Sequence, residues 1–155
     1  MERIEFNLLK AELDAQIKEI EKIFAEIEER KKGVNRSKAK LESLAYKLHN
    51  LYCAFEDLFK VIARHFENHV EDIARFHKEL LKRMSIRIEG VRPALLSEDA
   101  FKVLDELRAF RHYFRHAYSY ELRHEKLKPV IEAAGMLREF YRDGIESFLR
   151  EIEVY

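Results

Sequence analysis

Apolar residues recur at spacings of three and four along most of this chain, and that period is typical of amphipathic α-helices. In the first pattern, for example, Phe6, Leu9 and Leu13 fall on one stripe, and Glu and Lys occupy the other faces. Five such patterns are separated by short irregular stretches. They predict helices at about residues 2–32, 38–66, 70–84 and 125–151, and a further one that starts at 98 and ends between 114 and 117.

Residues that favour helix ends stand between these patterns. Gly33 is a stop signal after the first helix, and the segment 35–37 offers a cap for the second. Ser97 precedes two acidic residues, which suit the positive end of the fourth helix. Pro129 is tolerated because it falls in the first turn of the last helix. The segment 86–96 contains Gly90 and Pro93 and is predicted to be the longest loop.

The composition supports an all-helical chain. The 155 residues include only four Gly and two Pro, too few for a turn-rich β architecture, whereas 37% of them are charged. A chain of this length with 47% hydrophobic residues buries one sizeable core. We therefore expect one domain over residues 1–155, folded as an antiparallel bundle of about five helices.

Net charge and cysteine content narrow the functional classes. Twenty-nine Lys and Arg balance twenty-nine Asp and Glu, so any attraction for nucleic acid must be local. The single cysteine, Cys53, excludes a disulfide framework and fits a reducing compartment. The chain has neither an apolar run long enough for a membrane span nor the apolar core of a secretory signal. These features predict a cytoplasmic protein without a membrane partner.

The segment 108–128 carries a net positive charge, unlike the chain as a whole. It holds six Lys or Arg against two Glu, together with three His and five aromatic residues. Arg108, Arg111 and Arg115 are spaced i, i+3 and i+7, so that a helix presents all three on one face. Unpaired, these like charges repel one another, and a phosphodiester matches the fork of a guanidinium. The alternative is that acidic residues of a neighbouring helix neutralise them.

His116 gives the same segment a group that transfers protons near neutral pH. It follows Arg111 by five positions, which separates the two side chains by about 140° on a continuous helix. If the helix ends after about Phe114, both groups can face one cleft, with Tyr118 nearby. An imidazole and a guanidinium suffice to cleave RNA without a metal, because the 2′-hydroxyl of the RNA is the nucleophile.

The segment from Arg111 to Tyr118 fits the order Arg, polar residue, three residues, His, one residue, Tyr. This order resembles the signature of HEPN-domain ribonuclease toxins of the HepT type. The position of the motif, at the end of the penultimate of about five helices, is also similar. The resemblance implies a HEPN-like bundle that forms a homodimer and acts as a metal-independent endoribonuclease, without a cofactor. It leaves open whether transfer RNA or messenger RNA is the substrate.

The resemblance also implies roles for individual residues of the motif. Arg111 would stabilise the scissile phosphate, and His116 would be the general acid or base. His112 would support the site from the polar position of the motif, and Arg108 and Arg115 would add positive charge. Two copies of these residues would meet across the dimer interface in one cleft.

Tyr118 corresponds to the tyrosine that accepts AMP in systems pairing such a toxin with a minimal nucleotidyltransferase, called MNT. The resemblance therefore implies an MNT-type antitoxin as the partner, which silences the toxin by AMPylation of Tyr118. The acidic pair Glu56 and Asp57 adds further candidates, because a carboxylate that faces the cleft could orient His116 or pair with Arg111.

Three alternatives are compatible with the sequence. The chain could be a non-catalytic HEPN-type module that binds a nucleotidyltransferase partner or a nucleotide. The i, i+4 pairs His65/His69 and His112/His116 could chelate a metal, although only one Glu-x-x-His motif is present, whereas a di-iron bundle needs two. The first 32 residues could be a coiled-coil arm for assembly.

Overall fold

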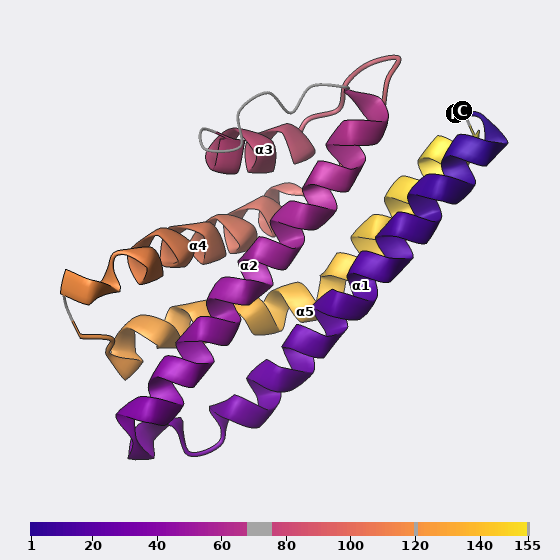
Figure 1. The fold of residues 1–155 in the computed structure, drawn as a ribbon. Helices are drawn as coiled ribbons and strands as arrows, with labels where there is room; N and C mark the ends of the chain where they lie inside the picture. Colours follow the sequence, from indigo (N-terminus) through magenta and orange to yellow (C-terminus); the bar gives the residue numbers. More distant parts are fainter. Residues whose placement is uncertain (68–75, 120, 155) are drawn as a thin grey trace.

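The computed structural model describes residues 1–67, 76–119 and 121–154. Within these residues it contains five α-helices and no strand, which confirms the prediction of an all-α bundle (Figure 1). None of the described helices has the length and apolarity needed to cross a membrane. The helices are α1 (Arg3–Lys31), α2 (Lys38–Phe66), α3 (Phe76–Met84), α4 (Glu98–Arg115) and α5 (His124–Val154).

The helix boundaries lie close to those that the sequence predicts. Gly33 adopts φ +70°, the left-handed conformation that ends α1. The hydroxyls of Ser37 and Ser97 accept hydrogen bonds from the backbone N–H groups of Lys40 and Ala100, and so cap α2 and α4. Residues 70–75 of the predicted third helix lie outside the described residues.

Contacts between side chains establish that α1 runs antiparallel to both α2 and α5. Glu12, near the start of α1, contacts His65 near the end of α2, whereas Glu26 pairs with Lys47. The carboxylate of Glu21 accepts a hydrogen bond of 2.5 Å from the Tyr141 hydroxyl of α5. Figure 1 shows α1 lying along both helices. The first helix is therefore part of the bundle rather than a separate arm.

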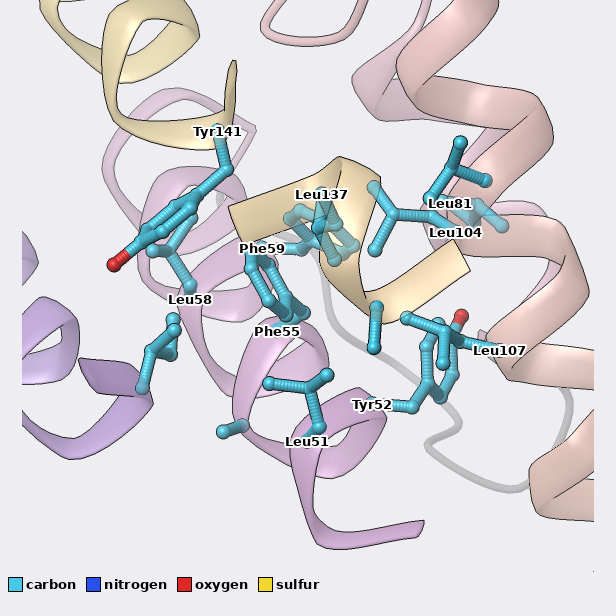
Figure 2. Close-up of a cluster of buried hydrophobic side chains, with 14 of the residues drawn as sticks. Leu51, Tyr52, Phe55, Leu58, Phe59, Leu81, Leu104, Leu107, Leu137 and Tyr141 are labelled. Atoms are coloured by element: carbon cyan, nitrogen blue, oxygen red, sulfur yellow. The ribbon is translucent and has the colours of Figure 1, made fainter. Parts of the chain in front are cut away.

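The core forms around α2, which contacts α1, α3, α4 and α5. Figure 2 shows part of it, with side chains from four of these helices. Burying such apolar side chains contributes about 1.5–3 kcal/mol each. The labelled members are Leu51, Tyr52, Phe55, Leu58, Phe59, Leu81, Leu104, Leu107, Leu137 and Tyr141.

The predicted loop between α3 and α4 is organised by the buried side chain of Arg92. Its guanidinium donates to a carboxylate oxygen of Glu67 at 2.8 Å and to the backbone carbonyls of Arg83, Ile86 and Pro93. These bonds connect the end of α2 to the loop, because Glu67 directly follows α2.

Candidate active site

Helix α4 ends one residue before His116, as the sequence predicts. His116 is the C-cap, with φ −106° and ψ 11°, and its backbone N–H donates to the carbonyls of Tyr113 and Phe114. A short 3-10 helix, Ala117–Ser119, follows directly. The chain therefore keeps its helical path from Arg111 to Arg115 and departs from it only at His116.

Three rings of the motif gather at this end of α4. The ring centroids of His112 and His116 are 4.7 Å apart, and those of His116 and Tyr118 are 6.5 Å apart. Both imidazoles are exposed, and Tyr118 is 87% exposed. The proton-transferring candidate and the predicted AMP acceptor thus share one accessible surface.

Arg111 contacts a different element. Its Nε lies 3.7 Å from a carboxylate oxygen of Glu56 on α2, and the two side chains are only 17% and 4% exposed. This ion pair confirms one of the two roles considered for Glu56. The convergence of Arg111 and His116 on one cleft stays a prediction, because Arg111 is engaged at the junction of α2 and α4.

Two of the three arginines on this face of α4 have acidic partners. Arg108 donates from Nε to a carboxylate oxygen of Asp105 at 2.8 Å, and Arg111 pairs with Glu56. For Arg111 the alternative of an acid on a neighbouring helix therefore holds, whereas the acid that pairs with Arg108 lies one turn earlier on α4 itself. Arg115 is exposed and has no acidic partner among the described residues.

The sequence interpretation missed two residues of α2 that lie behind the motif. His49 stacks against Phe114 at 5.0 Å between ring centroids, and the buried Tyr52 hydroxyl has no hydrogen-bond partner within the described residues. Burial, followed by the Glu56 carboxylate, raises the pKa of Tyr52. His49, Tyr52 and Glu56 are spaced i, i+3 and i+7, so they lie on one face of α2, and this spacing could have grouped them.

The pKa of His49 is lowered, first by burial and then by the positive charges of Arg111 and Arg115. The folded state therefore binds fewer protons than the unfolded state as the pH falls through about 6.5, and stability decreases there. We expect His49→Gln to remove this part of the decrease. Urea unfolding at pH 7.5 and pH 5.5 would measure it, and an equal decrease in both proteins would contradict the expectation.

Among the described residues, the candidate histidines do not belong to a larger group of metal ligands. In the part of the chain that the structure describes, no three His, Cys, Asp or Glu side chains gather as a metal site. His65 instead contacts Glu12, with 3.3 Å between Nε2 and the carboxylate oxygen. Its proposed chelating partner, His69, lies outside the described residues.

The sequence of this chain matches a known protein family. The family model described as HepT-like protein matches residues 43–152, which is most of the chain. The chain belongs to the HepT-like family. The match starts within α2 of this HepT-like protein, includes the segment from Arg111 to Tyr118 and omits α1. No curated protein and no solved structure matches the chain. The resemblance to HepT-type HEPN toxins is thus confirmed for the family.

Proposed function

We propose that this HepT-like protein is the toxin of a HEPN/MNT pair and a metal-independent endoribonuclease. The observation that carries the proposal is the position of His116, exposed at the first residue after α4 within a complete Arg111, His116 and Tyr118 set. Membership in the HepT-like family supports the same function. A module that only binds a partner has no physical need for this set.

The protein has to supply only a proton-transferring group and positive charge for this reaction. The 2′-oxygen of the RNA attacks the adjacent phosphorus, and the bond from phosphorus to the 5′-oxygen breaks. His116 either removes the 2′ proton or protonates the leaving oxygen, and guanidinium groups stabilise the charge on the phosphate oxygens. Arg115 is suited to bind phosphate because it has no acidic partner among the described residues. Glu56 holds Arg111 in one orientation.

A homodimer places two such sets in one cleft. His112, His116 and Tyr118 lie on an exposed surface, which is accessible to a second copy of the chain. Arg115 of each copy would add positive charge to that cleft. Doubling the local charge gives this neutral protein the attraction for RNA that its overall composition does not provide.

The proposed activity is tested with the purified chain and transfer or messenger RNA in EDTA. We expect cleavage to persist in the chelator, since the 2′-hydroxyl is the nucleophile and side chains supply the remaining groups. Sequencing of the RNA ends would locate the cuts. Cleavage only with added divalent metal would contradict the mechanism. No cleavage under any condition would favour the non-catalytic module that binds a nucleotidyltransferase or a nucleotide.

Silencing is proposed to occur by transfer of AMP to Tyr118. The phenolic oxygen attacks the α-phosphorus of ATP, pyrophosphate leaves, and the phenolic proton is lost. Tyr118 is 87% exposed, so a partner enzyme can reach it, and its ring lies 6.5 Å from that of His116. Each AMP places a charge of about −1 and a base where the RNA would bind. The modification therefore excludes substrate.

We expect Tyr118→Phe to remain toxic and unmodified when it is co-expressed with the cognate nucleotidyltransferase, because it lacks the accepting oxygen. Intact-protein mass spectrometry would detect one AMP group on the wild-type chain. Tyr46→Phe is the matched control, since Tyr46 is also exposed (54%) but lies on α2. This control should still gain AMP, and AMP on Tyr118→Phe would place the acceptor elsewhere.

A further inference from the structure

The imidazoles of His112 and His116 form a pair with a specific geometry. They lie four residues apart, His112 in the last turn of α4 and His116 as its C-cap. Their ring centroids are 4.7 Å apart, with 58° between the ring planes. Both side chains are exposed, so ions from solvent can reach the ring nitrogens. Imidazole nitrogen is a preferred ligand of zinc.

The separation of the two rings agrees with shared coordination of one ion. A zinc–nitrogen bond of about 2.0–2.1 Å places a ring centroid roughly 3.2 Å from the ion. Two rings bound at the tetrahedral angle then have centroids about 5.2 Å apart. The observed 4.7 Å is close to this separation, and side-chain rotation can make up the difference. Zinc can therefore bridge the pair without moving the backbone at the end of α4.

The electrostatic surroundings permit a divalent cation. The charges of Arg108 and Arg111 are balanced by Asp105 and Glu56, which leaves Arg115 as the nearby guanidinium without an acidic partner among the described residues. The described residues contain no cluster of three ligand side chains, so water would complete the coordination. A site of two imidazoles and water is open and exchanges its metal readily.

We propose that His112 and His116 form a zinc site that inhibits this protein. The lone pair that binds zinc is unavailable to accept a proton, and the ion occupies the space in front of His116 that a phosphate would enter. The binding part of the proposal rests on the separation and the exposure of the two rings. Inhibition rests on the proposed ribonuclease function, in which His116 transfers a proton. Free zinc would then act on the same surface as AMPylation of Tyr118, but reversibly.

Binding is tested by calorimetry, with zinc chloride titrated into the full chain after removal of any affinity tag. We expect one zinc ion per chain. His112→Ala and His116→Ala should each weaken binding about tenfold or more, because loss of a ligand costs at least as much as loss of an outer-shell partner. His65→Ala is the control and should bind like the wild type. Equal affinity in His112→Ala and the wild type, or weakened binding in His65→Ala, would overturn the site.

Inhibition is tested separately, by titrating zinc into the RNA cleavage assay. We expect cleavage by the wild type to fall to half near the measured Kd and to return with EDTA. For His112→Ala, the zinc concentration that halves its own zinc-free cleavage rate should be at least about tenfold higher than for the wild type. Zinc binding without loss of cleavage would overturn the inhibitory role. If the zinc-free chain does not cleave RNA, the ribonuclease proposal and the inhibition fail together, and the binding result still decides the site.

Discussion

His116→Ala is expected to lower the rate of RNA cleavage by about 10²- to 10⁴-fold, the usual contribution of a general acid or base. The side chain is exposed at the end of α4 and its backbone forms the cap, so removal of the imidazole leaves the helix end intact. Cleavage rates of the purified proteins would measure the effect. Circular dichroism and the urea midpoint would show that the fold is unchanged.

The matched control is His124→Ala, which removes another imidazole of the same basic segment. His124 starts α5 and lies outside the motif. We expect the control to cleave RNA at close to the wild-type rate, and expression of the wild type alone to slow growth where His116→Ala does not. Undiminished cleavage by His116→Ala would end the proposed mechanism, whatever the growth phenotype.

Arg111→Ala is expected to lower cleavage by about 10²- to 10⁴-fold and also to destabilise the fold. The second effect arises because Arg111 is an ion-pair partner of the Glu56 carboxylate, a side chain that is only 4% exposed. Removing that partner costs about 1–3 kcal/mol of unfolding free energy. Urea unfolding measures this cost separately from cleavage.

A second substitution separates the two effects. Arg111→Ala combined with Glu56→Gln replaces the buried carboxylate with a neutral amide, so part of the lost unfolding free energy should return. Cleavage should stay low, because the guanidinium that stabilises the phosphate charge is still absent. Recovery of cleavage together with stability would show that Arg111 acts only through the fold.

Much of the site could be predicted because its determinants are local. Ser97 and Gly33 act on neighbouring backbone groups, so the helix ends follow from the sequence to within a few residues. The end of α4 before His116 was instead a condition of the proposed cleft, and the structure bears it out. Likewise, residues two to four apart in the motif, such as His112 and His116, lie near one another whatever the rest of the chain does.

The remaining part of the site depends on packing between helices. Sequence spacing left open whether acidic residues pair with the three arginines, since Glu56 is 55 positions away from Arg111 and belongs to another helix. The apolar stripe of α2 determines which way that helix turns, and this rotation carries Glu56, His49 and Tyr52 to the junction with α4. The stripe shows which face of α2 is buried but not which helix that face meets, because the meeting follows from how two buried surfaces fit.

By itself the amino-acid sequence determined the helical class, the helix boundaries and the exposed motif that ends at Tyr118, because periodicity, capping and short spacings are properties of neighbouring residues. Only the tertiary structure decided that Arg111 is held by Glu56 whereas Arg115 stays without an acidic partner among the described residues. Ion pairs between helices depend on distances through space, which the burial of apolar faces fixes.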